Sequence, residues 1–181
     1  MQVFWTHGYG QTSTRGLLKA MQISRSSFYQ VFGSKEQLFL EALERYRATL
    51  IERLRRRLAI APSAQSFLET LFLDTAGEAS SDRASLGCLI FNSVGEINQL
   101  DPASSVAARD SMAAITDLFR EAVLQGQADG SITAAHDADT LAHYLTLSMA
   151  GLRTLLKTGG DGHQAQAAAR LVLDTTGNIT P

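Results

Sequence analysis

The chain has 181 residues, of which 45% are hydrophobic and three are proline, so it can bury a sizeable core and is not a disordered segment. No apolar run is long enough to span a bilayer, the first residues lack the basic and apolar regions of a secretory signal, and a single cysteine excludes an internal disulfide framework. These features predict a cytoplasmic protein that does not enter a membrane.

The net charge of −2 conceals an uneven distribution along the chain. Residues 1–57 hold ten Lys and Arg against four Asp and Glu, giving +6, whereas residues 58–181 hold six against fourteen, giving −8. A basic part joined to an acidic part is typical of a module that binds a polyanion and is attached to a second module that does not.

The first residues of the chain predict two helices. Residues 3–7 form the end of a first helix, which stops at Gly8. Residues 12–21 form a second helix, because hydroxyl side chains open this segment and its apolar residues Leu17, Leu18 and Met21 have helical spacing. A tight turn over residues 22–24 follows.

The segment from Arg25 to about Phe32 predicts a third helix, which Ser24 caps. Its apolar residues are Phe28, Val31 and Phe32, and its polar residues are Arg25, Ser26, Ser27, Tyr29 and Gln30. A helix of this length is marginal in isolation, so we expect it to pack on its neighbours. Two short helices joined by a tight turn match the helix-turn-helix, which places its second helix in the major groove of DNA.

Three side chains of the third helix suit contacts with DNA. Arg25 can donate two hydrogen bonds to guanine, and Gln30 can pair with adenine. Tyr29 is suited to a phosphate oxygen. The small serines beside them let the backbone approach the base edges closely.

A long helix is predicted from Lys35 to about Ala59, because Gly33 ends the third helix and Ser34 forms a reciprocal capping box with Gln37. Its apolar stripe consists of Leu38, Leu43, Tyr46, Leu50, Leu54 and Leu58. The arginines at 53 and 55–57 either contact DNA or form a solvated helix end that suits the helix dipole. Their distance from Ser34, roughly 27 Å along the helix, favours the second interpretation.

This N-terminal string resembles the DNA-binding domain of the tetracycline-repressor (TetR) family of bacterial regulators. The matching residues are Phe4, Gly8-Tyr9, Thr12-Ser13, Ile23-Ser24-Arg25-Ser26-Ser27-Phe28-Tyr29, Phe32 and Ser34-Lys35-Glu36-Gln37-Leu38. The resemblance implies that Thr12 and Ser13 contact phosphates. It further implies that Arg25, Ser26 and Ser27 face the bases. It also implies that Tyr29 and Lys35 contact the DNA backbone and hold it in place.

Two departures from the family pattern bear on DNA binding. The family usually has glycine in the turn where this chain has Gln22, so a left-handed backbone there would cost about 1 kcal/mol, or the turn would differ. The first helix is also shorter than in the family, which removes core contacts and phosphate contacts. Weak or lost DNA binding is therefore an alternative.

Further helices are predicted beyond residue 60. After Pro62-Ser63 come an apolar helix around residues 67–73, a loop over 77–85 and a buried helix over 86–97. The buried helix resembles a glycine-cysteine-leucine segment of one TetR subgroup.

The remaining residues predict three helices with clear starts. Asp101 and Pro102 open one that stops near Gly126, a turn over 130–134 follows, Asp137 caps a helix over 138–157, and Asp161 precedes the last. No segment alternates like a strand, so the fold class is all-α. We expect a helix-turn-helix head over residues 1–45 and a helical body over residues 46–181.

The last two helices carry many small side chains: Ala142, Ser148, Ala150 and Gly151 on one, and Ala165, Ala167, Ala168 and Ala169 on the other. Small residues allow close approach of helices, either inside one chain or between two chains. In the TetR family the matching pair forms a four-helix dimer interface, and two-fold symmetry is what a helix-turn-helix needs to read two half-sites. We therefore expect a homodimer.

The resemblance also implies a small hydrophobic or amphipathic effector that binds between the body helices. The candidate lining residues are Phe67, Leu71, Cys88, Phe91, Asn92, Glu96, Met112, Phe119, Tyr144 and Met149. Ordinary core packing explains any single one of the apolar residues equally well. No cofactor is expected, and the four histidines show no metal-ligand spacing with the cysteine.

Cys88 has two interpretations: an inert, buried small hydrophobe, or a thiol sensor of electrophiles or oxidants near a helix N-terminus. An enzyme is not expected, because no nucleophile, base and orienting residue can be assembled from the spacing. The sequence predicts a transcriptional repressor that a small-molecule effector releases from double-stranded operator DNA. The alternative is a helical small-molecule or electrophile-sensing protein with weak or lost DNA binding.

Overall fold

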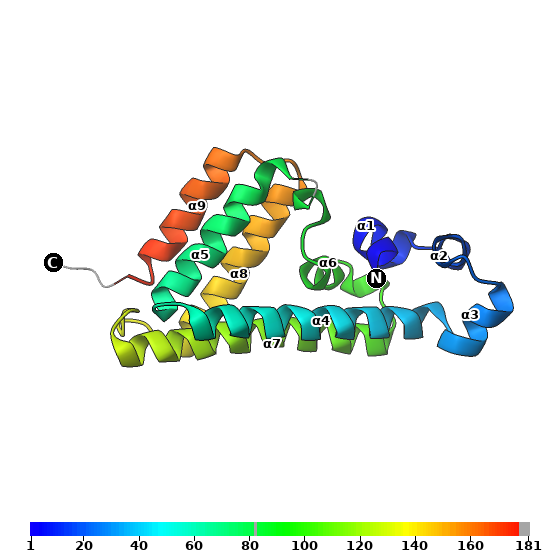
Figure 1. Ribbon diagram of the computed structural model, residues 1–181, viewed down its shortest axis with the longest axis horizontal. Coiled ribbons are helices and arrows are strands. Elements are labelled where there is room, and N and C mark those ends of the chain that lie inside the picture. Colours follow the sequence, from blue (N-terminus) through cyan, green and yellow to red (C-terminus); the bar gives the residue numbers. More distant parts are fainter. Residues whose placement is uncertain (82, 178–181) are drawn as a thin grey trace. The chain divides into compact units, whose positions relative to one another are not determined.

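A computed structural model describes residues 1–81 and 83–177, and within these ranges the chain is helical without any β-strand. The predicted all-α class is confirmed. The chain divides into two compact units, Met1–Leu50 with Cys88–Ala113, and Ile51–Gly87 with Ala114–Pro181. The long helices α4 (Lys35–Ile60) and α7 (Pro102–Asp129) each begin in the first unit and end in the second (Figure 1). The domain boundary at residue 45 stays a prediction.

The first unit contains α1 (Gln2–Gln11), α2 (Thr14–Met21), α3 (Arg25–Phe32), the start of α4, and α6 (Leu89–Gly95), which lies beside α1. Its core is rich in aromatic side chains. The ring of Phe39 on α4 lies 5.2 Å from the ring of Phe4 and 4.9 Å from that of Tyr9. Phe28 anchors α3 within the unit, because its side chain is fully buried. Burial of apolar residues from each short helix therefore holds the helix-turn-helix together.

Serine caps define where α2, α3 and α4 begin. The side chains of Ser13, Ser24 and Ser34 each accept a hydrogen bond, at 3.1 Å, from the amide three residues further along. The predicted return bond from Gln37 to the Ser34 amide is wrong, because this amide donates to the carbonyl of Phe32 at 2.8 Å instead. Each cap satisfies one amide that the helix itself cannot pair.

Gly8, Gln22 and Gly33 have positive φ in this unit, and the first two bear on the predicted turns. Gly8 has φ 75° and ψ 172°, which are not helical angles, so the helical backbone is interrupted at Gly8 as predicted, and α1 continues beyond this kink to Gln11. Gln22 adopts the left-handed conformation, with φ 55° and ψ 39°. The turn therefore keeps the geometry for which the family uses glycine, at a cost of about 1 kcal/mol.

The second unit contains α5 (Ala64–Gly77), α8 (Ala138–Lys157) and α9 (Gly162–Asp174), which lie side by side, together with the ends of α4 and α7 (Figure 1). The predicted caps of the last two helices are confirmed, because Asp137 accepts from Thr140 and Asp161 accepts from His163. Arg153 of α8 pairs with Glu78 at 2.5 Å and links α8 to the end of α5.

Two predicted helix bounds need correction. α6 covers only seven residues rather than 86–97, because Gly87 has φ 63° and Cys88 is extended. α7 continues three residues past Gly126. A Cβ added to Gly126 would lie 2.5 Å from the Ile132 side chain. Glycine there serves close packing and does not end the helix. Across residues 1–81 and 83–177, no helix has both the length and the apolar character needed to cross a membrane.

Candidate nucleic-acid interface

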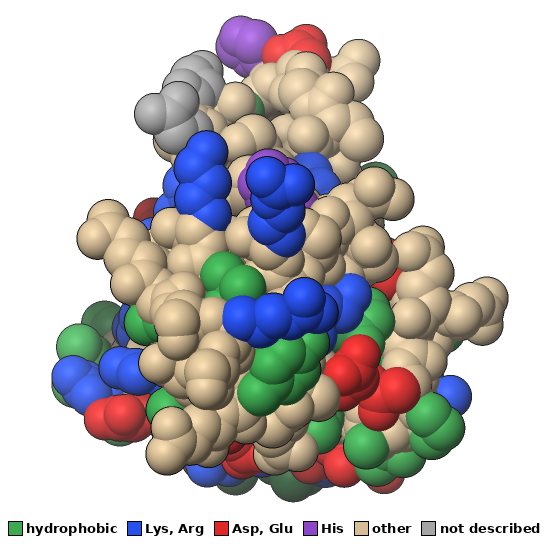
Figure 2. Space-filling model, turned by 90° about the vertical axis from the view of Figure 1, so that its right-hand side faces the viewer, with side chains coloured by type: hydrophobic (Ala, Val, Ile, Leu, Met, Phe, Trp, Pro, Cys, Tyr) green, Lys and Arg blue, Asp and Glu red, His purple; other side chains and the backbone are tan. Residues whose placement is uncertain are grey.

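The outward side of α3 carries the residues that the sequence assigns to DNA. Its polar side chains, Arg25, Ser26, Ser27, Tyr29 and Gln30, are all exposed. Figure 2 looks at this end of the molecule and shows Lys and Arg side chains beside apolar ones. The expectation that Val31 shares the apolar side of α3 is wrong, because 67% of its surface is exposed. Phe28, whose side chain is fully buried, anchors the helix instead.

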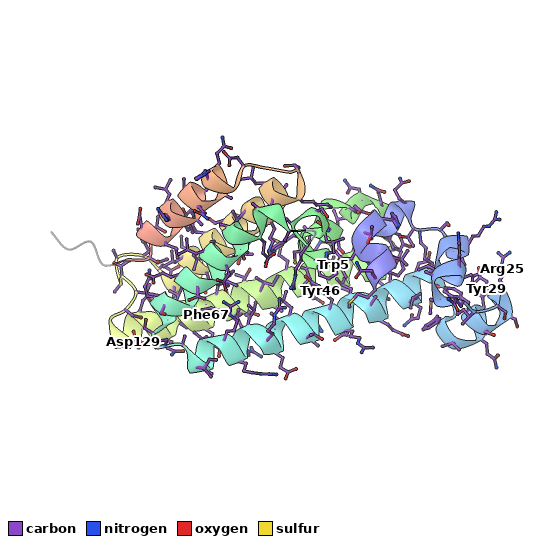
Figure 3. All side chains as sticks on the ribbon, turned by 45° about the horizontal axis from the view of Figure 1, so that its top comes forward. Trp5, Arg25, Tyr29, Tyr46, Phe67 and Asp129 are labelled. Atoms are coloured by element: carbon purple, nitrogen blue, oxygen red, sulfur yellow. The ribbon has the colours of Figure 1, made fainter. Side chains whose placement is uncertain are left out.

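Arg25 and Tyr29 lie one helical turn apart and form a pair. The guanidinium carbon of Arg25 is 5.8 Å from the centre of the Tyr29 ring, within the range of a cation–π interaction. Figure 3 shows both side chains together at the exposed end of α3. The hydroxyls of Ser24 and Ser27 are 2.9 Å apart, so Ser27 is tied to the cap of its own helix. In the unbound chain, the cation–π contact orients Arg25 toward Tyr29, and the cap orients Ser27.

A polar groove of about 470 Å³ lies at the N-terminus of α2. Its lining residues are Gly10, Gln11, Thr12, Ser13, Thr14, Tyr29, Ser34, Lys35 and Glu36. The N-terminus of a helix attracts anions, because its amides point outward and the helix dipole is positive there. Four of these residues, Thr12, Ser13, Tyr29 and Lys35, were predicted to contact DNA, whereas Gln11 and Thr14 line the same groove and were not among the predicted residues. Their positions beside the cap Ser13 are the sequence feature that indicates this location.

Thr12 and Ser13 have different surroundings in this groove. The Ser13 side chain is exposed, and its oxygen caps α2. Thr12 is buried, and its hydroxyl donates to the carbonyl of Gly8 at 2.6 Å. The Thr12 side chain therefore supports the connection between α1 and α2, whereas Ser13 faces solvent.

Lys35 anchors the end of α1. Its ammonium donates to the carbonyls of Tyr9 and Thr12, both at 3.1 Å, and lies 4.0 Å from the centre of the Tyr9 ring. A cation at the C-terminal end of a helix also suits the negative pole of the helix dipole. Lys35 thus joins α4 to the α1–α2 connection, a structural role that the sequence did not indicate.

The Tyr9 hydroxyl extends this network by donating to Glu36 at 3.1 Å. Burial, together with the Glu36 acceptor, raises the pKa of Tyr9 well above its ordinary value, so the phenol stays protonated. The pKa of Glu36 is lowered, mainly by its own backbone amide and by Ser34 at the start of α4. Because the pKa of Glu36 is lower in the folded chain than in the unfolded chain, its hydrogen bonds stabilise the fold above the pKa of the unfolded carboxyl. This stabilisation is lost as the pH falls through the folded-state pKa.

Glu96, which follows α6, contacts the kink in α1 from the other side. Its carboxylate accepts a hydrogen bond from the Gly10 amide at 3.1 Å. A Cβ on Gly8 would lie 2.1 Å from a Glu96 oxygen, and a Cβ on Gly10 would lie 2.1 Å from a Gln99 oxygen. The two glycines therefore permit a close approach of the residues after α6 to the backbone of α1. Glu96 was predicted to line a ligand pocket, and its carboxylate contacts the backbone of α1.

Cys88 is buried and lies at the start of α6. The Tyr46 hydroxyl donates to its sulfur at 3.6 Å, and the Tyr46 ring meets the Trp5 ring edge-on at 5.1 Å (Figure 3). This contact connects α6 to α1 through α4. A sensing role for the thiol stays a hypothesis.

The other candidate effector-binding residues fall in different parts of the chain. Phe67, Leu71, Phe119 and Met149 are buried in the second unit, where Phe119 packs against Phe72 at 6.2 Å. Tyr144 is partly exposed and lines an apolar surface pocket of about 260 Å³ with His136, Thr140, Leu141 and Thr175. Phe91, Asn92 and Met112 are half-buried in the first unit. Their role in binding an effector stays a prediction.

The arginines at the end of α4 have acidic partners. Arg55 pairs with Glu121, Arg56 with Glu52 and Arg57 with Asp74, at 3.2, 2.6 and 2.8 Å. These pairs agree with a solvated helix end rather than with a surface kept open for DNA. Within the described residues, no cluster of three or more His, Cys, Asp or Glu side chains could hold a metal ion.

Comparison with known proteins gives two matches to family descriptions. Residues 1–42 match "Bacterial regulatory proteins, tetR family", and residues 66–172 match "Tetracyclin repressor-like, C-terminal domain". The second match covers more than half of the chain. The subgroup suggested by the glycine-cysteine-leucine segment stays a prediction.

Three individual proteins illustrate the similarity. The uncharacterised HTH-type regulator YezE of Bacillus subtilis is 26% identical over 92% of this chain and 86% of its own length. The HTH-type transcriptional repressor ComR of Escherichia coli is 28% identical over 88% of this chain and 76% of its own. A cysteine mutant of the regulator CifR, solved with 26-bp operator DNA, is 31% identical, with a TM-score of 0.82 over 99% of this chain and 92% of its own.

Proposed function

This chain belongs to the TetR family of bacterial regulatory proteins and is a DNA-binding transcriptional regulator, and from this premise we propose that it is a repressor that a small molecule releases from its operator. The observation that carries the proposal is the exposed polar side of α3, which Ser24 caps and the buried Phe28 anchors. A short helix held in this way presents a rigid surface to the major groove.

In the proposed complex, α3 reads bases while the groove at α2 holds the DNA backbone. Arg25, Ser26, Ser27 and Gln30 face the base edges, with Arg25 leaving Tyr29 to donate two hydrogen bonds to a guanine. Ser13, Tyr29 and the positive end of α2 contact phosphates. The Lys35 charge adds attraction, although its ammonium already holds the end of α1.

The proposed active form is a homodimer formed through α8 and α9. Several small or apolar side chains of these helices are exposed: Leu147, Gly151, Ala167, Ala168 and Leu171. Ala142, Ala165 and Ala169, by contrast, are buried within the chain and serve its own packing. An exposed apolar stripe of this kind supports pairing with a second copy, which would place two α3 helices for two half-sites.

Release by an effector requires that a change in the body reach the DNA-binding helices. The hydrogen bond from Gly10 to Glu96 supports such a route, because it ties the residues after α6 to the backbone of α1. An effector that favours a different position of α6 would move α1 and, through Tyr9 and Lys35, the start of α4. Its differential affinity for the two arrangements sets how far the population shifts.

The Arg25→Ala variant tests the assignment of the recognition helix. We expect it to lose about 1–3 kcal/mol of binding free energy at one base position, because only the guanine that Arg25 contacts loses its partner. The measurement is the affinity of wild type and variant for an operator fragment and for fragments with each base pair changed in turn.

Arg109→Ala is the matched control, because Arg109 is exposed on α7 and lies outside the proposed interface. It is expected to bind all fragments like wild type. A variant at Arg25 that binds more weakly but keeps the sequence preference of wild type would remove this residue from the base-reading set.

A further inference from the structure

Val31 is a large apolar side chain that the recognition helix leaves in solvent. Its surface is 67% exposed, although it lies between the polar Gln30 and the half-buried Phe32. Packing within its own unit does not explain this residue, because Phe28 fills the buried side of α3. Isolated exposed apolar residues are common on protein surfaces, so the position on α3 is what gives Val31 its interest.

Helix geometry places Val31 on the base-reading strip of α3. Residues four apart share a side of a helix, so Val31 lies one turn beyond Ser27. Ser26 and Gln30 form the adjacent row, while the Arg25–Tyr29 pair occupies the opposite edge, where Tyr29 lines the phosphate groove. Val31 is therefore the apolar member of a strip that otherwise carries hydrogen-bonding groups.

The major groove offers one strongly apolar feature, which is the 5-methyl group of thymine. A branched side chain such as valine has few rotamers, so it can contact a methyl group with little loss of side-chain entropy. We propose that Val31 packs against the 5-methyl group of a thymine in each half-site and thereby specifies the base at that position. This inference rests on the proposed docking of α3 in the major groove.

The experiment begins with a random-sequence duplex pool, from which wild type, Val31→Ala and Val106→Ala select binding sites. Val106→Ala is the matched control, because Val106 is exposed on α7 and outside the interface. Alanine favours helices more than valine does, so Val31→Ala is expected to fold. The wild-type duplex is then rebuilt with deoxyuridine at one thymine at a time, which removes only the methyl group.

We expect one thymine per half-site at which deoxyuridine weakens wild type and Val106→Ala about fourfold, the loss that one buried methyl group would cause. Val31→Ala should bind the thymine and deoxyuridine duplexes equally and should select sites without that thymine preference. If Val31→Ala keeps the wild-type response to deoxyuridine, or loses affinity equally at every position, Val31 does not read a methyl group. If wild type selects no sequence at all, the proposed function fails as well.

Discussion

Gly8→Ala is expected to lower the free energy of unfolding by about 3 kcal/mol. The φ and ψ of Gly8, 75° and 172°, lie in a region that is nearly exclusive to glycine, and an L-residue there costs about 1–3 kcal/mol. The new Cβ would also push the Glu96 carboxylate away, since one of its oxygens lies 2.1 Å from the ideal Cβ position, and would break the bond to the Gly10 amide. Urea unfolding followed by fluorescence reports this unit, because Trp5 on α1 is the single tryptophan.

Two further variants separate the sources of this loss. Gly16→Ala should stabilise the chain by up to about 1 kcal/mol, because Gly16 lies inside helix α2 and its Cβ would approach only the Ser13 oxygen, at 3.4 Å. In a Glu96→Ala background, Gly8→Ala should cost about 1 kcal/mol less than in wild type, because the displaced partner is gone. An equal cost in both backgrounds would show that Glu96 does not constrain the kink.

Lys35→Met is expected to cost about 3 kcal/mol of stability. The ammonium makes two charge-assisted hydrogen bonds, to the carbonyls of Tyr9 and Thr12, and each such bond contributes about 1.5–3 kcal/mol before solvent screening at this partly exposed site. Methionine retains the aliphatic length and leaves both carbonyls without this partner. The same variant should weaken binding to all DNA sequences alike, because Lys35 contributes charge without reading bases.

The stability measurement uses urea unfolding, and affinity is compared at a temperature where the variant is folded. Lys19→Met is the control, because Lys19 is an exposed lysine in the last turn of α2. It removes the same charge at a surface site and should change stability by less than about 0.5 kcal/mol. If both variants unfold at the same urea concentration, Lys35 does not hold α1 to α4.

The parts of the fold that the sequence predicted are those that local chemistry decides. Ser13, Ser24 and Ser34 each cap the helix that follows, and a cap involves only residues within one turn. The bounds of α8 were predicted correctly for the same reason, since Asp137 caps it directly. Short-range rules suffice for such elements because the interacting groups are neighbours in the chain.

The parts that were not predicted depend on contacts between distant segments. Glu96 reaches Gly10 across 86 residues, and Lys35 reaches Tyr9 across 26. Neither residue type indicates such a partner in advance. The exposure of Val31 was also missed, because apolar spacing over an eight-residue helix does not tell which of its edges meets a neighbour.

The most direct test of the proposed function is a titration of the purified chain against duplex DNA from immediately upstream of its own gene. The titration is made at two salt concentrations, with scrambled duplex as control and with the number of bound chains determined. We expect selective binding that weakens as salt rises, with two chains on each site. Equal binding to the scrambled duplex, or binding to neither duplex, would contradict the repressor proposal and favour a helical small-molecule-binding protein that has weak or lost DNA binding.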